Sequence, residues 1–285
     1  MKLNDISIVI LFYKTPDNVI KNLNNYKDFN LYILDQSNDT KLKKKIEKKF
    51  PNIKYYGISN ENKGFAKGIN FLVKKVKTKY FLCTQPDIII SKKSIYTLKK
   101  TFKGKKDGII TVPKVKQFKN YTIKEKSKKI FSVKKILGAI FLANTKKFTK
   151  IGMFDERFFF YWEDVDLCKK IESNNLKIYL NMTATADHEG EKSVKKNLKS
   201  FMIRKIYFKY GEHIFQLKYR KLRLIKFVRE PIKFFLLMVW YSLTLQFKKS
   251  LENLCFIYAI IKFFFFFKKK HQNWAILVIF LNLEK

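Results

Sequence analysis

Short apolar runs alternate with helical stretches through the first two-thirds of the sequence. Residues 6–12 are almost wholly apolar and rich in β-branched side chains, as expected of a strand that is covered on both faces. Similar runs follow at 30–34, 53–58, 79–83 and 109–112, and stretches with a helical pattern, such as 41–49, lie between them. Two further strands are expected later in the chain, at 177–180 and 184–188. Strands that alternate with helices predict an α/β fold, with a mostly parallel sheet and helices on both of its faces.

Polar features follow three of these predicted strands. Asp35 ends the second run, a glycine-bearing turn at 60–70 follows the third, and Asp87 follows the fourth. Ligands of such sheets bind beyond the carboxyl ends of the strands, so the three features together indicate a binding site. The exposed amides of the glycine turn could hold a phosphate. Each feature also has a simpler interpretation, since aspartates and glycines are common in ordinary turns and connections.

An acidic stretch stands out in a chain that is rich in lysine. Residues 152–171 read GMFDERFFFYWEDVDLCKKI, with Glu163, Asp164 and Asp166 at the start of a helical pattern. Asp164 shares one helical face with the apolar residues at i+3, i+4 and i+7. A carboxylate among apolar groups tends to have a raised pKa and can act as a base. The alternative is that these acids only complement the dipole of the first helical turn, and it applies most to Glu163 and Asp166.

His188 and the cysteines bear on metal binding. His188 lies between Asp187 and Glu189, so it could complete a metal site with oxygen and nitrogen ligands, although a surface histidine is the more common case. The three cysteines are far apart in sequence, which predicts neither a zinc site nor a disulfide framework and indicates a reduced, cytosolic setting. The first apolar run is short and is followed by polar turn residues, so no signal peptide is expected.

The net charge of +38 restricts the classes of partner. Of the 61 basic residues only five are arginine, and proteins that read nucleic acids favour arginine for bidentate contacts. The charge fits an anionic membrane surface or phosphate-bearing substrates at least as well as it fits nucleic acid. No nucleic-acid partner is expected.

Several blocks of sequence occur in a fixed order. The blocks are SIVILFYK from Ser7, ILDQSND from Ile33, ENKGFAKGIN from Glu61, QPD from Gln85, GAIFLA from Gly138, FDERFFFYWEDVDLC ending at Cys168, and DHEG from Asp187. Each block is modest alone, but the set in this order is specific. It resembles family 2 glycosyltransferases of the GT-A fold, in particular their bacterial rhamnosyltransferase-like branch. The resemblance covers residues 6–210, about three-quarters of the chain.

The resemblance implies a role for each candidate residue. Asp35 would bind the pyrimidine base of a nucleotide sugar, and Asp87 and His188 would hold a divalent cation, Mn²⁺ or Mg²⁺, on the diphosphate. Asp164 would be the general base that deprotonates the acceptor hydroxyl, and Glu163 would support it or contact the acceptor. The nucleotide and its diphosphate would be lined by Asn62, Gly64, Phe65 and Ala66.

The resemblance also implies an inverting enzyme that transfers a hexosyl unit, with rhamnose from a thymidine diphosphate donor as the first expectation. The acceptor would be a saccharide or lipid-linked saccharide in the synthesis of a surface polysaccharide of the O-antigen or capsule type. Three positions depart from the family pattern. Gln85 stands at the first position of the metal-binding D-x-D motif, and Phe12 and Lys14 replace the usual Thr and Asn of the first strand.

The last 75 residues differ in composition from the rest of the chain, which predicts a glycosyltransferase domain at 1–210 and a basic, apolar helical region at 211–285. A basic amphipathic helix is expected at 193–210, followed by apolar runs at 234–247, 254–267 and 274–283. Fourteen helical residues extend about 21 Å, less than the roughly 30 Å of a bilayer core. We therefore expect interfacial helices that attach the protein peripherally to the cytoplasmic face of the cell membrane. A helical cap on the domain and an oligomer contact are the alternatives.

Two classes of function are compatible with the sequence. The first is a metal-assisted glycosyltransferase, and the second is a non-catalytic basic protein that binds membranes or nucleic acids. The acids at positions 35, 87 and 164 and the histidine at 188 favour the enzyme, because a binding module has no need of them.

Overall fold

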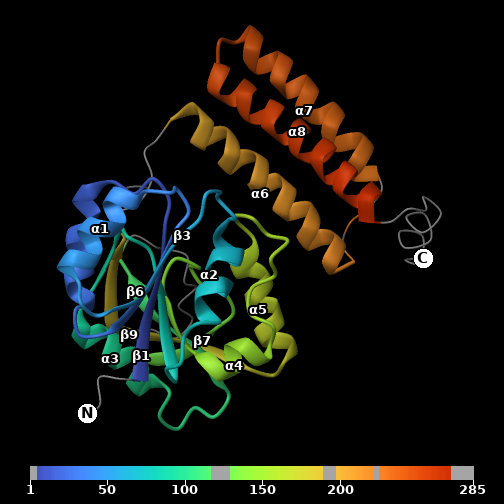
Figure 1. Cartoon of the computed structure of the whole chain (residues 1–285). Coiled ribbons are helices and arrows are strands. Elements are labelled where there is room, and N and C mark those ends of the chain that lie inside the picture. The colour runs from blue at the N-terminus through green and yellow to red at the C-terminus, as the bar shows by residue number, and fades with distance from the viewer. Residues whose placement is uncertain (1–4, 117–128, 189–196, 221, 223–224, 271–285) are drawn as a thin grey trace. The chain divides into compact units, whose positions relative to one another are not determined.

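A computed structural model describes residues 5–116, 129–188, 197–220, 222 and 225–270. Its contacts divide the chain into two compact units (Figure 1). The sheet unit comprises Met1–Glu156 and Glu163–Lys195, and the helical unit comprises Arg157–Trp162 and Lys196–Lys285. The boundary predicted at residue 210 lies inside a helix of the helical unit, and whether the two units are independent domains stays a prediction.

The sheet unit is built on nine strands, which run in the order β3-β2-β1-β4-β8-β6-β9-β5, with β7 paired to β9. They are β1 (Ile6–Phe12), β2 (Asn30–Asp35), β3 (Ile53–Ile58), β4 (Tyr80–Thr84), β5 (Ile88–Ile90), β6 (Gly108–Val115), β7 (Ile130–Val133), β8 (Phe141–Asn144) and β9 (Lys177–His188). The α/β fold is confirmed. The sheet is parallel from β3 to β4 and mixed beyond, because β8 runs antiparallel to both β4 and β6.

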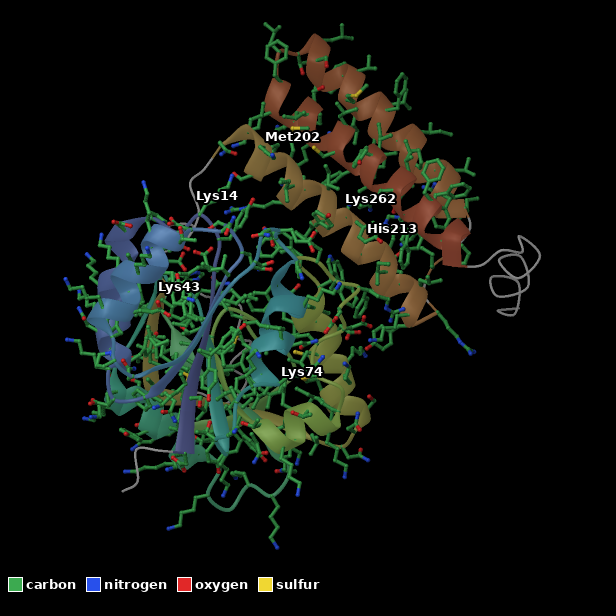
Figure 2. The ribbon with its side chains drawn as sticks, viewed as in Figure 1. Lys14, Lys43, Lys74, Met202, His213 and Lys262 are labelled. Carbon is green, nitrogen blue, oxygen red and sulfur yellow. The ribbon has the colours of Figure 1, made fainter. Side chains whose placement is uncertain are left out.

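Helices cover both faces of this sheet, as predicted, with α1 and α3 on one face and α2, α4 and α5 on the other (Figure 1). Lysine side chains project from their outer sides (Figure 2). The helices are η2 (Asp17–Tyr26, a 3₁₀ helix), α1 (Thr40–Lys49), α2 (Phe65–Val73), α3 (Lys92–Thr101), α4 (Thr145–Lys150) and α5 (Glu163–Ser173). Alternate residues of β1, from Ile6 to Phe12, pack with Leu42 and Ile46 of α1 and Ile95 of α3 in one buried cluster.

The helical unit contains α6 (Leu198–Lys218), α7 (Ile225–Leu243) and α8 (Phe247–Lys270). Its core joins α6 to α8 through Tyr210, Ile214, Ala259 and Phe263, and the segment 157–162 contributes Phe158. Helix α6 begins with a capping box, in which the side chains of Asn197 and Ser200 each bond the backbone N–H of the other residue.

Three sequence expectations need correction. The strands expected at 177–180 and 184–188 form the single strand β9, and α6 extends to Lys218 rather than ending near 210. Helices α7 and α8 are 19 and 24 residues long, because they include the polar residues that flank the apolar runs. The run expected at 274–283 and residues 193–196 of the expected amphipathic helix lie outside the described residues.

Candidate active site

The sheet topology brings the candidate residues to one edge. Asp35 is the last residue of β2, the Gly64 turn follows β3, and Asp87 follows β4, three strands of the parallel set β3-β2-β1-β4. Strand β8 runs antiparallel to β4, with Phe141 opposite Cys83, so the residues before β8 also lie at the carboxyl end of β4. His188 reaches this edge because β9 pairs antiparallel with β5, which places it opposite Ile88.

Asp35 is completely buried and has one oxygen in use and one available. Its Oδ1 accepts hydrogen bonds from the backbone N–H of Ser37, at 2.7 Å, and from the Ser37 hydroxyl. Its Oδ2 is buried and has no hydrogen-bond partner among the described residues. A buried acceptor without a partner is costly, so this oxygen is suited to accept a hydrogen bond from a ligand.

The Gly64 turn is held to the end of β2 by Gln36. The Gln36 side chain accepts a hydrogen bond from the Lys63 N–H at 2.8 Å and donates one to the Gly64 carbonyl at 3.3 Å. Gly64 has a φ of 84°, a conformation that glycine adopts without strain, and the Asn62 side chain accepts a bond from its N–H. Helix α2 then starts without a side-chain cap, so the N–H groups of its first turn, at Phe65 and Ala66, can face an anion.

Asp87 and His188 form the candidate metal site. The Asp87 side chain is buried, and its Oδ2 lies 3.6 Å from His188 Nε2. Within the described ranges, no group of three or more His, Cys, Asp or Glu residues could hold a metal ion. One carboxylate and one imidazole suit a divalent cation that is also held by substrate phosphates and water, rather than a site built from protein ligands alone. Asp187, which is next to His188, forms an ion pair with Lys116 at 2.9 Å.

Glu163 and Asp164 open helix α5, as predicted, and Glu163 is the more buried of the two. Its Oε2 has no hydrogen-bond partner among the residues that the structure describes. Burial, and then the charge of Asp164, raise the pKa of Glu163 to about 8. The raised pKa expected for Asp164 is also present and is caused by burial. The sequence did not predict the shift at Glu163, because the apolar pattern of α5 places Asp164 but not its neighbour on the inner face.

Gly138 holds the carboxylate of Asp164. Its backbone N–H donates to Asp164 Oδ2 at 3.2 Å, and the N–H of Val165 donates to Oδ1 at 2.8 Å. A Cβ atom at position 138 would lie 2.9 Å from Asp164 Cβ, so only glycine allows this approach. The two hydrogen bonds favour the ionised form of Asp164 and act against the effect of burial.

Gln36 and Gly138 were not among the predicted site residues. Both lie within the quoted sequence blocks, Gln36 beside Asp35 and Gly138 at the start of GAIFLA. Their roles depend on contacts with residues 26 to 28 positions away, which the local sequence does not reveal.

The family model of Glycosyl transferase family 2 matches residues 7–168. The matched span includes Asp35, Asp87, Glu163 and Asp164, and it ends before His188. No curated protein matches the sequence.

Solved glycosyltransferase structures share the fold at low sequence identity. The mannosyltransferase PcManGT from Pyrobaculum calidifontis, in complex with GDP-Man and Mn²⁺, has a TM-score of 0.58 at 11% identity, over 74% of this chain and 64% of that one. GalNAc-T7 with UDP, GalNAc and Mn²⁺ has a TM-score of 0.57 at 11% identity, over 75% of this chain and 50% of that one. TarS of S. aureus, residues 1–349 with UDP, has a TM-score of 0.54 at 12% identity, over 91% of each chain. The chain thus spans half of the GalNAc-T7 chain and less than two-thirds of PcManGT.

Proposed function

Because the chain belongs to glycosyl transferase family 2, we propose that it is an inverting glycosyltransferase that uses a nucleoside diphosphate sugar as donor. The observation that carries the proposal is the pair formed by the buried Glu163 and the half-buried Asp164, at the sheet edge that also holds Asp35 and Asp87. Removing adjacent carboxyl groups from water lowers the stability of the folded protein. A catalytic role as a general base gives a functional reason for such a pair.

The donor would bind along the edge formed by β2, β3 and β4. The free oxygen of Asp35 accepts a hydrogen bond from the base, and the first turn of α2 faces the diphosphate. Asp87 and His188 would hold a divalent cation, which supplies positive charge to stabilise the departing diphosphate. Neighbours of the same fold were solved with UDP or GDP-Man, which supports a nucleotide donor of this kind.

Asp164 would act as the general base. Its carboxylate takes the proton from the acceptor hydroxyl, and the hydroxyl oxygen attacks the anomeric carbon as the bond from that carbon to the diphosphate oxygen breaks. The bonding electrons leave with the diphosphate, and the anomeric configuration inverts. Glu163, with its pKa of about 8, keeps its proton at neutral pH and so adds no negative charge beside Asp164.

The sugar and the acceptor follow from the resemblance and form the finer part of the proposal. We expect a thymidine diphosphate donor carrying rhamnose, and a saccharide or lipid-linked saccharide acceptor in the synthesis of a surface polysaccharide. Phe12, the last residue of β1, pairs in register with Asp35, so a departure from the family pattern adjoins the residue that would bind the base.

Calorimetric titration of the protein with uridine, thymidine and guanosine diphosphates, with and without Mn²⁺, tests the proposal. We expect metal-dependent binding of one of the pyrimidine diphosphates, lost in Asp87→Ala and kept in Asp28→Ala, an exposed acid paired with Lys92. Asp164→Asn should bind that diphosphate normally and lose transfer from the matching donor by about 10²–10⁴-fold. Folded protein that binds none of the three, or an Asp164→Asn variant with normal turnover, would contradict the assignment.

A further inference from the structure

Helix α7 presents an apolar face that nothing in the described part of the chain covers. None of its residues is buried. Large apolar side chains recur every three or four residues on its outer side, with exposed fractions from 39% to 76%. They are Ile225, Val228, Ile232, Phe235, Leu236, Val239, Trp240 and Leu243. Contiguous exposed apolar surface on this scale marks an interaction site.

Helix α8, which packs against α7, also carries exposed apolar side chains. Its inner side, with Cys255, Ala259, Ile260 and Phe263, is buried. Its outer side carries Leu254, Tyr258, Ile261 and Phe265, which are 47% to 63% exposed and lie on one helical stripe. We call the exposed apolar residues of α7 and α8 the outer face of the hairpin.

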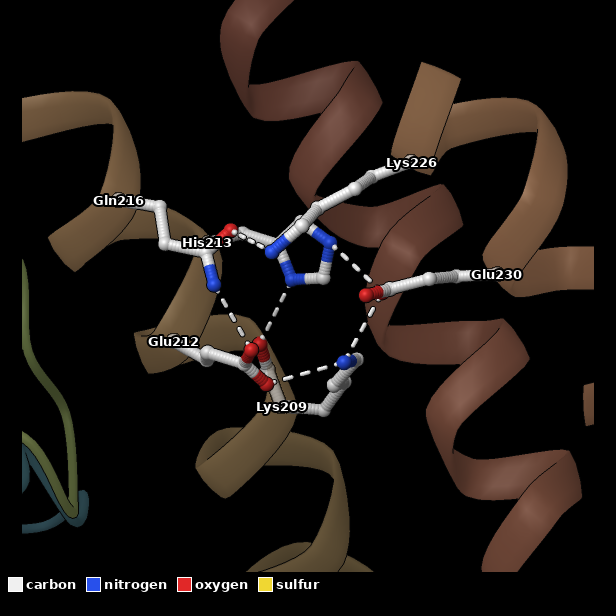
Figure 3. A network of polar contacts seen from close by, with 6 residues as sticks. All are labelled: Lys209, Glu212, His213, Gln216, Lys226 and Glu230. Carbon is white, nitrogen blue, oxygen red and sulfur yellow. Dashed lines mark hydrogen bonds and ion pairs between the residues drawn. The ribbon is translucent and has the colours of Figure 1, made fainter. Parts of the chain in front are cut away.

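The charge of the helical unit matches an anionic partner. Residues 197–270 include 17 basic residues and three acidic ones. Each of the three acids is held in an ion pair, Glu212 and Glu230 with Lys209 at 2.9 Å and Glu252 with Lys205 at 2.7 Å. Figure 3 shows the cluster around Lys209, in which Glu230 also faces His213. The acids are thereby neutralised, and the remaining lysines and arginines, such as Arg229, Lys233, Lys248 and Lys249, give the unit a strong positive charge.

The two helices are suited to lie on a bilayer rather than to cross it. By length and composition alone, one described helix, over Phe247–Phe267, could span a membrane. Its inner side, however, is packed against α6, and its Lys262 donates a hydrogen bond to the Tyr207 hydroxyl of α6 at 2.9 Å. Helix α7 carries Arg229, Glu230 and Lys233 in its first half, so only about ten apolar residues follow, or about 15 Å of helix. Neither helix is free to be surrounded by lipid.

We propose that the outer face of the α7–α8 hairpin binds an anionic membrane surface, with both helices parallel to the bilayer plane. The apolar side chains enter the boundary between headgroups and acyl chains, and the flanking lysines and arginines contact the anionic headgroups. This proposal rests on the helical unit and does not require the assignment of a donor or a base.

Sedimentation of the full chain with vesicles tests this assignment. Leu236→Glu places a charge in the outer face, and Leu198→Glu is a matched control on α6, since the two leucines are 63% and 65% exposed. Both side chains are exposed, so neither change should impair folding. With vesicles of phosphatidylglycerol and phosphatidylcholine, Leu236→Glu should reduce binding at least about tenfold, as expected for one lost leucine insertion. Leu198→Glu should bind like the unaltered protein.

Three outcomes would overturn the proposal. The two variants could bind vesicles equally, or the unaltered protein could bind pure phosphatidylcholine as tightly as anionic vesicles. Alternatively, light scattering without vesicles could show a dimer that Leu236→Glu converts to a monomer while vesicle binding is unchanged, which would make a second copy of the chain the occupant.

Discussion

At the scale of single residues, two neighbouring carboxyl groups of α5 have different environments. Glu163 is buried and one of its oxygens has no hydrogen-bond partner among the described residues, so its neutral form is favoured. Asp164 accepts two backbone hydrogen bonds, from Gly138 and Val165, and these favour its charged form. The proton is therefore held preferentially by Glu163 and the negative charge by Asp164, which places a base next to a group that can donate a hydrogen bond.

Glu163 should make the stability of the protein depend on pH in a defined direction. Its pKa is about 8 in the folded state against an ordinary value of 4.5, so the folded state holds a proton that the unfolded chain releases. The free energy of unfolding should therefore fall as the pH rises from 4.5 to 8 and level off above that range. Glu163→Gln removes this titration and should lack the fall, which amounts to at most about 1.4 kcal/mol for each pH unit crossed. Urea unfolding of both proteins at pH 6 and pH 9 measures the effect, and equal changes in the two proteins would contradict it.

The sequence predicted the acids of the site better than the groups that position them. Asp35, Asp87 and Asp164 could be selected because they follow strands or share a helical face, which are local features. Gly138 could not be assigned, because its role depends on the approach of α5, which follows 25 residues later. The unpartnered Oδ2 of Asp35 was likewise not predictable, since its Oδ1 is satisfied by a local turn that looks ordinary in sequence.

At the scale of elements, the aromatic segment before α5 packs in the helical unit. Phe159 stacks on Tyr207 with ring centroids 4.2 Å apart, and Trp162 contacts Phe215 at 5.2 Å. Tyr161 and Trp162 have φ angles of 70° and 71°, which are costly for bulky residues. Trp162 is followed directly in the sequence by Glu163, the first residue of the helix that carries the acids.

Gly211 of α6 should be required for this packing. A Cβ atom there would lie 3.0 Å from Trp162 Cδ1 and 3.2 Å from the Tyr161 carbonyl oxygen. Alanine in place of glycine normally stabilises a helix interior by about 1 kcal/mol. Gly211→Ala should instead destabilise the protein by about 1 kcal/mol, because the contact is too close for a methyl group. Thermal unfolding measures the sign, and Gly211→Ala should cost less in a Trp162→Leu background than in the unaltered protein. A higher melting temperature for Gly211→Ala alone would show that Trp162 can move away.

Most strands and helices of the sheet unit were predictable because their patterns are local. β1 and β3 have the predicted bounds, and α1 differs by one residue. The expectation of two strands, at 177–180 and 184–188, was wrong, because the polar residues between them continue the single strand β9. In the structure, the Asn181 side chain donates to Thr101 at 2.8 Å and accepts from Thr183, which satisfies these groups within one strand. Such tertiary compensation is not visible in the sequence.

At the scale of the whole molecule, the charge of +38 and the exposed apolar residues contribute to partner binding in different ways. Charge attracts the protein to any anionic surface from a distance, but it acts without orientation and is screened by salt. The apolar residues act only on contact, and most of the large exposed ones belong to α7 and α8. An anionic membrane is the partner that engages both, whereas nucleic acid would engage the charge alone.

The two contributions should separate in a salt titration of vesicle binding. Raising NaCl from 0.1 M to 1 M shortens the screening length from about 10 Å to about 3 Å, so the contribution of the lysines and arginines should be lost. The contribution of the outer face should persist, because salt does not weaken apolar burial. The unaltered protein should therefore keep measurable binding to anionic vesicles at 1 M NaCl, and Leu236→Glu should bind at least about tenfold more weakly there. Sedimentation of both proteins across this range provides the measurement. If all binding of the unaltered protein disappears at high salt, charge alone holds it to the membrane, and the apolar face of the hairpin serves another purpose.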